Sequence, residues 1–262
     1  MADTFYIQTG DGEFDSAPST AGPWSPQAQH AGPPSALLAR QIERHDPREG
    51  HRLARVSVDI LAPIPVAPLS ISVESLRQGR RVELLQATVS AGGREVAVAR
   101  AWRLLTTPAD LPEARVPDTP GAGEADLSDA TTASFPGAYA DGYLSVVEWS
   151  FEYGGFDEYG PAKGWARPRI PLVEGEEMSG WQRALTIADS GSGISVCAPI
   201  TEMQAINCDL TVVLDRDPEG EWIGLESRTT LSAGGGAMTA SKVHDLSGAI
   251  GTATQTLLAG AV

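Results

Sequence analysis

Three polar residue types in the C-terminal half of this chain could together activate a water molecule. Asp209 lies in "NCDLTVVLDR", Gln255 in "TATQTLL", and the neighbours Thr229 and Thr230 in "ESRTT". A carboxylate can take a proton from water, while an amide and a hydroxyl hold that water in place. Such hydrolysis needs no serine or cysteine nucleophile. The pattern therefore favours general-base hydrolysis, provided that these side chains meet in a dry cleft.

An internal duplication is the reason to expect that meeting. Three matched pairs of residues are each 153 positions apart, namely Leu61 and Leu214, Pro65 and Pro218, and Leu104 and Leu257. One offset shared by two separate strand-like segments indicates a repeated unit. In this register Asp209 matches Val56, and Gln255 matches Trp102. The second copy is thus predicted to carry polar groups where the first carries apolar ones.

Each copy reads as one helix followed by several strands. "PPSALLARQIERH" carries Leu37, Leu38 and Ile42 on one face at helical spacing, with Arg40 outside, and "SGWQRALTIADSG" is its counterpart. Alternating runs such as "RVSVDIL" and a short "AGG" turn predict strands and a hairpin. Since βαβ alternation is absent, we expect an α+β fold with antiparallel sheets. Pro, Gly, Ala and Asp crowd residues 108–142, which predicts a linker between domains at 1–107 and 143–262.

The predicted strand faces decide whether Asp209 can serve catalysis. Val56, Val58 and Ile60 alternate onto the face that the helix should cover. A buried carboxylate there needs hydrogen-bond donors or a functional role, and Gln255 with one of the two threonines would supply donors. The alternative is that Asp209 lies at a strand edge or faces solvent. Thr229 competes with Thr230, because matching the paired "ES" dipeptides requires one gap.

The stretch "QHAGPPSALLAR", residues 29–40, predicts a sharply defined helix start. Proline is favoured at the first helical position, and Gly32 would let backbone approach a ligand closely. The N–H groups of Ala31, Gly32 and Ser35 could then bind a carbonyl oxygen, helped by the positive end of the helix. The alternative is an ordinary core helix. His30 beside this turn is expected to be a hydrogen-bonded structural residue rather than a base.

Composition excludes some functions and partners. Formal net charge is −15, so phosphate repulsion disfavours nucleic acid as a partner. The two cysteines, Cys197 and Cys208, lie in apolar surroundings and are expected to be buried thiols in a reducing cytoplasm. We expect no membrane span, and no metal because the four histidines are not paired as ligands. Arg77 and Arg80 in "RQGRR" could meet an anionic ligand, although a solvated hairpin is the simpler interpretation.

The sequence resembles the acyl-CoA thioesterase II family, whose single chains carry two hotdog folds, and more closely its actinobacterial thioesterase-like branch. "QHAGPPSALLAR" resembles the family's His/Phe-Gly-Gly start of the first hotdog helix. "VDILAPIPVAPLSISVESLRQGRRVELLQATV" and "INCDLTVVLDRDPEGEWIGLESRTT" resemble its strand blocks. One departure is Pro33 in place of the second glycine, which removes a backbone donor. The resemblance implies two tandem hotdog folds, each a sheet wrapped around one main helix.

The resemblance also implies an activity and a site. In that family an Asp, a Thr or Ser, and a Gln of the second hotdog orient a water against the thioester of acyl-CoA. By matching motifs these are Asp209, Thr230 and Gln255, while His30, Ala31, Gly32, Arg77 and Arg80 would contact the substrate. CoA enters only as part of the substrate, with no other cofactor. A homo-oligomer is plausible by analogy.

Hydrolysis of fatty acyl-CoA, within cytoplasmic fatty acid metabolism, is therefore the expected function. A non-catalytic acyl-thioester binding protein is the alternative from another class. A hotdog hydratase ranks third, because it expects an Asp and His pair near a helix start and none is apparent in the sequence. Acyl length, the carrier and the oligomeric state are not specified by these residues.

Overall fold

The computed structural model describes residues 4–106 and 125–261. Its N-terminal half contains one main helix, α1 (Gly32–Arg44), and a short 3-10 helix at Pro18–Thr20. Its strands are β1 (Tyr6–Gly10), β2 (Glu13–Ser16), β3 (His51–Ile60), β4 (Pro68–Arg77), β5 (Val82–Ala91) and β6 (Arg94–Leu105). One helix against mainly antiparallel strands is the arrangement that the residue pattern predicts.

The described C-terminal half repeats this order with additions. Its main helix is α3 (Gly180–Ala188), accompanied by the short helices α2 (Tyr143–Val146) and α4 (Gly191–Ile194). Its strands are β7 (Thr131–Thr132), β8 (Val147–Tyr153), β9 (Ala162–Pro168), β10 (Met203–Asn207), β11 (Asp209–Leu214), β12 (Ile223–Leu231), β13 (Gly236–Asp245) and β14 (Gly248–Ala261). The hairpin β8–β9, the helix and the last four strands correspond in order to β1–β2, α1 and β3–β6.

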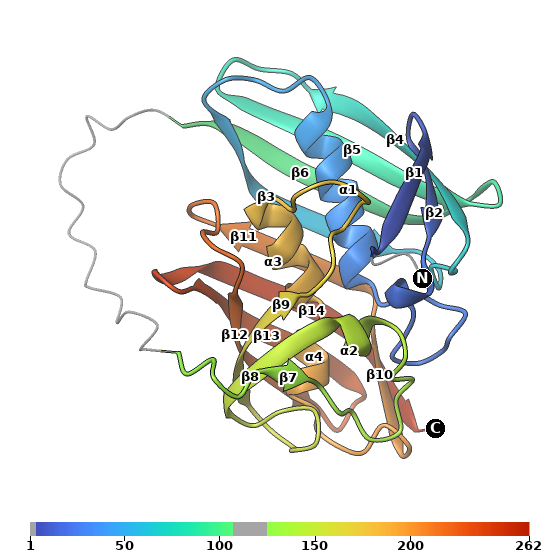
Figure 1. The fold of residues 1–262 in the computed structure, drawn as a ribbon, viewed down its shortest axis with the longest axis vertical. Helices are drawn as coiled ribbons and strands as arrows, with labels where there is room; N and C mark the ends of the chain where they lie inside the picture. The colour runs from blue at the N-terminus through green and yellow to red at the C-terminus, as the bar shows by residue number, and fades with distance from the viewer. Residues whose placement is uncertain (1–3, 107–124, 262) are drawn as a thin grey trace.

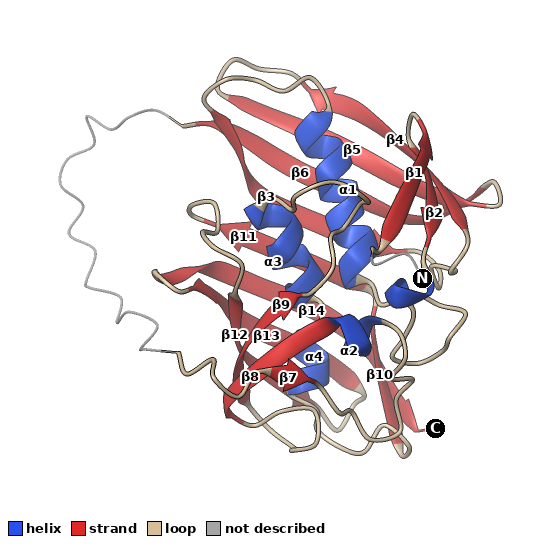
Figure 2. Cartoon of the chain, in the orientation of Figure 1, coloured by secondary structure: helices blue, strands red, loops and turns tan. Residues whose placement is uncertain are grey.

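All these strands form one large sheet whose order is the same from either end. The path runs β1-β2-β4-β5-β6-β3 and continues β11-β14-β13-β12-β9-β8-β7, with β10 paired to β14 beside it. The first six positions are mirrored by the next six, and only β7 and β10 lack a counterpart. Figure 2 shows the helices lying against this extended sheet. The symmetry places the junction of the two halves between β3 and β11.

The register at that junction corrects the offset that the sequence suggests. Ser57 lies opposite Thr211, and their hydroxyls are 2.6 Å apart. Val58 faces Ala99 in one half and Val212 faces Ala253 in the other, so equivalent residues differ by 154 (212 − 58 and 253 − 99). The predicted offset of 153 is therefore wrong by one residue. A one-residue slip exchanges the two faces of every strand.

The exposures of one matched pair show the error directly. Leu61 is 52% exposed, whereas Leu214, its partner at an offset of 153, is 1% exposed. In the corrected register Asp209 matches Arg55, and Gln255 matches the buried Ala101. In the corrected register Gln255 still lies on the buried face of its strand. Asp209 instead lies on the face opposite to the buried Leu210 and Val212.

The helices α1 and α3 pack against each other in the middle of the molecule, side by side in Figure 1. They run antiparallel, since His30 before α1 contacts Asp189 after α3, while Glu43 near the end of α1 bonds Ser179 before α3. Enclosure by the sheet and the partner helix leaves little of α1 exposed. Arg40, which we expected outside, is therefore buried, and its guanidinium pairs with Glu176 at 2.6 Å.

Part of the segment between the predicted domains is packed against the C-terminal half. β7 pairs with β8, and Phe135 is buried in the core. Residues 108–124 of the predicted linker at 108–142 lie outside the described residues. The domain limits 1–107 and 143–262 stay a prediction. Among the described helices, none combines the length and the apolar character that a membrane crossing requires.

Replacement of Gly32 by alanine tests the close packing of the two helices. A Cβ at position 32 would lie 2.3 Å from the carbonyl oxygen of Thr186 on α3, far inside van der Waals contact. We expect Gly32→Ala to cost about 1–3 kcal/mol, as overpacked cores do. The melting temperature should fall by roughly 2–10 °C. Gly234→Ala is the control, because a Cβ there meets nothing within 4 Å. Equal melting temperatures for the two variants would contradict this packing.

Candidate active site

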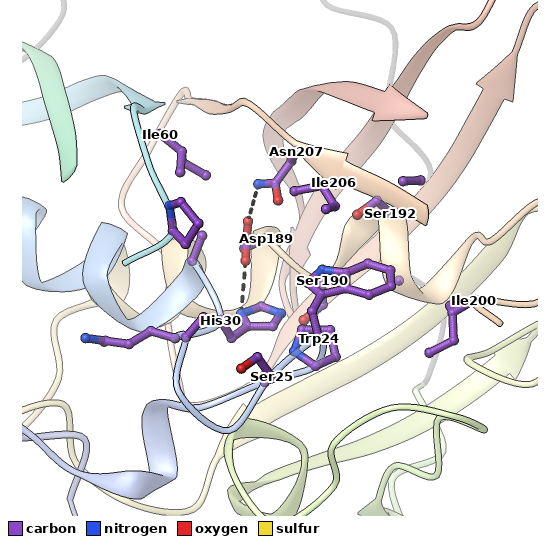
Figure 3. Close-up of a pocket in the computed structure, with 18 of the residues that line it drawn as sticks. Trp24, Ser25, His30, Ile60, Asp189, Ser190, Ser192, Ile200, Ile206 and Asn207 are labelled. Atoms are coloured by element: carbon purple, nitrogen blue, oxygen red, sulfur yellow. Dashed lines mark hydrogen bonds and ion pairs between the residues drawn. The ribbon is translucent and has the colours of Figure 1, made fainter. Parts of the chain in front are cut away.

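A cavity of about 630 Å³ opens where the start of α1 meets the end of α3. Its walls come from both halves: the segment leading into α1, the loop after β3, α4, and strands β10 and β12. Most lining residues are apolar, including Trp24, Ile60, Ile64, Phe135, Leu144, Phe156, Val196, Ile200, Ile206 and Leu258. Polar groups converge at one place, around Asp189 (Figure 3). Such a cavity, apolar with a few fixed polar groups, is typical of a small-molecule site.

Asp189 places a carboxylate inside this cavity. It forms the C-cap of α3 and is 5% exposed. Its Oδ1 accepts a hydrogen bond from Asn207 Nδ2 at 2.7 Å, and Gln255 Nε2 lies 3.4 Å from the same oxygen. Its Oδ2 lies 3.0 Å from His30 Nδ1. Figure 3 shows the carboxylate between His30 and Asn207, each joined to it by a dashed line. Both oxygens are thus held by side chains.

His30 is fixed in position by stacking as well as by Asp189. Its ring lies parallel to that of Tyr143, with centroids 3.7 Å apart and planes 7° from parallel. The Tyr143 hydroxyl donates to Thr186 O at 2.9 Å and lies 3.0 Å from Ser190 Oγ. Burial raises the pKa of Tyr143 far above its usual value, and the Asp189 charge adds to this. The phenol therefore stays neutral and keeps its donor at any physiological pH.

Gln255 lies behind Asp189 rather than in the cavity wall. Its side chain is 3% exposed, and its Nε2 also donates to the backbone carbonyl of Asp189 at 3.0 Å. Its Oε1 accepts from the backbone N–H of Ser192 at 3.1 Å. The amide therefore fixes both the end of α3 and the start of α4. It is not among the residues that line the cavity.

Of the two candidate threonines, Thr229 lines the cavity and Thr230 does not. The Thr229 hydroxyl lies 2.8 Å from Ser195 Oγ and 2.7 Å from Thr239 Oγ1. Thr230 points to the other face of β12, beside Leu231 and Met238 at a shallow surface hollow. Successive residues of a strand face opposite sides, so only one of the pair could contribute. Of the two threonines, Thr229 is therefore the one that a ligand in the cavity could contact.

Asp209 lies outside the cavity, contrary to the prediction. It begins β11 on the sheet face opposite to the buried Leu210 and Val212, and its Oδ1 accepts from the backbone N–H of Thr256. At this point β14 changes its partner from β11 to β10. The carboxylate satisfies a backbone donor that the change of partner would leave unpaired. The sequence places Asp209 on the covered face only in the duplication register that is wrong by one residue.

The helix-start donors are also fewer than expected. Ser35 N donates to Ala31 O within the helix. Gly32 is not a cavity residue, and its missing side chain admits Thr186 instead of a ligand. Ala31 does line the cavity, and no acceptor for its N–H is found in the described part of the chain. Ala31 is the donor that a bound carbonyl could use.

Arg77 and Arg80 lie away from the cavity. They are exposed at the turn between β4 and β5, where the Arg80 carbonyl contacts His51 Nε2. The cavity residues Ile64 and Pro65 precede the other end of β4. A strand of ten residues separates the two places, or about 30 Å at 3.3 Å per residue. The structure therefore does not bring these arginines to the site.

Asp189 and Asn207 are the site residues that sequence reasoning missed. "TIADSGSG" places an aspartate directly at the C-terminal end of an amphipathic helix, where the helix dipole disfavours negative charge. An acid in that unfavourable place, followed by two glycines and two serines, was the available signal. Cys197 and Cys208 also differ from expectation, since both are exposed and line the cavity.

Family models match almost all of the sequence. The acyl-CoA thioesterase N-terminal domain matches residues 20–104, and the acyl-CoA thioesterase C-terminal domain matches residues 108–259. The chain belongs to the acyl-CoA thioesterase family. It is a thioesterase, and its family takes acyl-CoA as substrate.

Solved structures share the fold of this thioesterase. A hotdog-fold protein of unknown function from Alicyclobacillus acidocaldarius aligns with a TM-score of 0.73 and 17% identity, over 99% of this chain and 97% of that one. The tesB protein of Mycobacterium avium subspecies paratuberculosis gives 0.65 and 16%, over 97% and 96%. The acyl-CoA thioesterase II TesB2 of Mycobacterium marinum gives 0.63 and 14%, over 99% and 96%. At these identities the comparisons establish the hotdog fold. No curated protein matches the sequence.

The two cavity cysteines offer a test of where this thioesterase binds its substrate. A bulky maleimide on Cys197 or Cys208 would fill space within the cavity, so we expect alkylation to abolish turnover and acyl-CoA to slow the alkylation. Partial desolvation in the cavity wall raises the pKa of the Cys197 thiol, so labelling should accelerate as pH rises from 7 to 9. Mass spectrometry and CoA release measure the two effects.

The matched control is the double variant Cys197→Ser, Cys208→Ser, which should keep its activity in the presence of the reagent. Full activity of a wild-type enzyme carrying the bulky label on both thiols would contradict the assignment of this cavity.

Proposed function

We propose that this chain, as two tandem hotdog folds, hydrolyses fatty acyl-CoA to free acid and CoA without a covalent intermediate. Asp189 and Thr229 would orient the attacking water in the cavity, and Gln255 would position Asp189. The observation that carries the proposal is the buried Asp189 carboxylate, with both oxygens held by donors inside an apolar cavity. The same negative charge favours removal of a proton from a neighbouring water.

Hydrolysis by an activated water needs a carboxylate whose position is fixed and whose charge is not screened by bulk water. Moving a carboxylate into a protein interior costs several kcal/mol. Hydrogen bonds to charged groups contribute about 1.5–3 kcal/mol each. The donors from His30, Asn207 and Gln255 are therefore of the right order to offset this cost. A negative charge held this way strengthens its effect on any reacting group in the cavity.

The remaining parts of the reaction have candidates in the same cavity. The aromatic rings of Phe135 and Phe156, with centroids 5.3 Å apart, bound an apolar region beside α4 that suits an acyl chain. The N–H of Ala31 could bind the thioester carbonyl oxygen and stabilise the oxyanion. Loss of one such donor typically costs about 3–4 kcal/mol of transition-state stabilisation. A thiolate is a good leaving group, so no metal is needed in this scheme.

A second candidate function has one observation in its favour. A hotdog hydratase expects an Asp and His pair at a helix start, and the fold brings His30 and Asp189 from different halves to 3.0 Å. Both reactions activate water, but a hydratase adds it to the carbon–carbon double bond of an enoyl thioester. Incubation with a trans-2-enoyl-CoA distinguishes them: we expect release of CoA, whereas formation of a hydroxyacyl-CoA would favour the hydratase.

The proposal also includes a cellular location, a metabolic context and an oligomeric state. A cytoplasmic location and a place in fatty acid metabolism remain predictions, as does a homo-oligomer. The non-catalytic alternative predicts tight binding of acyl-CoA without turnover.

Paired substitutions test the proposed residues. We expect Asp189→Asn to lower kcat/KM for an acyl-CoA by about 10²–10⁴-fold, because general base catalysis in the cavity depends on this negative charge. Thr229→Ala should lower it about tenfold or more, through one lost hydrogen bond to a reacting water. The matched controls Asp209→Asn and Thr230→Ala should stay within about threefold of wild type, because neither residue lines the cavity.

Release of CoA, measured with a thiol reagent over a panel of chain lengths, gives these rates. Equal rates for Asp189→Asn and Asp209→Asn would refute the assignment. Tight binding by a wild-type protein that releases no CoA would favour the binding protein instead.

A further inference from the structure

The contact between His30 and Asp189 leaves one question that the proposed function does not answer, namely which atom receives the proton of the attacking water. His30 Nδ1 lies 3.0 Å from Asp189 Oδ2, and the two side chains are 8% and 4% exposed. An ionised carboxylate has only acceptors, so a hydrogen bond between them requires the proton on Nδ1. The contact therefore fixes which ring nitrogen bears a proton.

The neighbouring backbone offers a competing hydrogen bond. Gly32 N lies 3.2 Å from the same Nδ1, and a bond there would need that nitrogen to be unprotonated. The two bonds exclude each other. A bond to an ionised acceptor is about twice as strong as a neutral one, and the distance to Asp189 is the shorter. Nδ1 therefore carries a proton, and in the neutral form of the ring the lone pair is then on Nε2.

The environment of Nε2 suits a base. His30 lines the cavity, and in the described residues no protein group bonds to Nε2. Nε2 has no partner among the described residues and is not fully buried, so it is accessible from the cavity. The stack on Tyr143 fixes the plane of the ring, and Asp189 fixes its rotation. The titratable groups that face it are Asp189 and Tyr143, with the Cys197 and Cys208 thiols farther along the cavity wall.

We propose that His30 is the general base of this thioesterase and that Asp189 is its positioning residue; this rests on the proposed hydrolysis of acyl thioesters in this cavity. Nε2 takes one proton from water as the water oxygen bonds to the thioester carbon, giving a tetrahedral oxyanion and an imidazolium. The oxyanion collapses, the C–S bond breaks, and the departing thiolate takes the Nε2 proton. The products are a carboxylic acid and a thiol, and the imidazole is neutral again.

In this scheme Asp189 keeps its charge throughout. It holds the imidazole in the required tautomer and stabilises the imidazolium that forms. The contribution of a positioned general base is typically 10²–10⁴-fold in rate. The base comes from the N-terminal half and its carboxylate from the C-terminal half, so neither half alone would be complete.

Substitution of His30 tests the assignment in the full-length enzyme. His30→Asn keeps an amide donor toward Asp189 but removes the base, so we expect kcat to fall by about 10²–10⁴-fold with KM changed less than about threefold. The acidic limb of the wild-type kcat/KM profile should disappear in this variant. His51→Asn, at the exposed start of β3, is the matched control and should keep both rate and profile.

A second variant keeps the test decisive if His30→Asn is poorly folded. His30→Ala leaves a cavity beside Asp189, and added imidazole should restore part of its CoA release, which a merely structural role would not allow. Near wild-type kcat in His30→Asn, with Asp189→Asn inactive, would overturn the proposal and make the carboxylate itself the base. A wild-type enzyme that releases no CoA from any acyl-CoA would instead refute the proposed function, and this inference with it.

Discussion

Burial of the Asp189 carboxylate is the interaction on which the rest of the site depends. The charge lies at the C-terminal end of α3, where the helix dipole opposes it, and inside a cavity with mainly apolar walls. Such a charge persists only if other groups donate to it. Asn207 and Gln255 donate from the C-terminal half, and His30 from the N-terminal half. The positive, N-terminal end of α1 adjoins the same place. It offsets part of the unfavourable interaction between the Asp189 charge and the C-terminal end of α3.

The opposite end of the helix pair shows how far the two copies have diverged. There Glu43, near the end of α1, accepts from Ser179 and Gln182 at the start of α3, which is the favourable helix end for an anion. Burial nevertheless raises the pKa of Glu43. Arg103 on β6 donates to backbone carbonyls just after the end of α1. It also pairs with the buried Glu83 at 2.6 Å. The strand order is thus symmetric, whereas the side chains at the two ends of the helix pair differ.

The sequence predicts much of this fold and less of the site, for identifiable reasons. Helical spacing places α1, and alternation of residue types places the strands, because both depend on local periodicity. The site depends on register. A duplication offset wrong by one residue leaves every strand in place but exchanges its faces. The sequence therefore predicts Asp209 in the cavity, although its carboxylate accepts from a backbone N–H at a strand junction. Gln255 is buried in either case, because it follows the strict alternation of β14. Asp189 and His30 lie in different halves, and no local pattern shows that they meet.

The central claim is that acyl thioesters react beside the Asp189 carboxylate. A crystal structure of the Asp189→Asn variant with an intact acyl-CoA tests it most directly. The account predicts the thioester carbonyl next to side chain 189, its oxygen toward the Ala31 N–H, and the acyl chain between Phe135 and Phe156. A thioester bound outside this cavity, whether at Asp209 or near the β4–β5 turn, would contradict it.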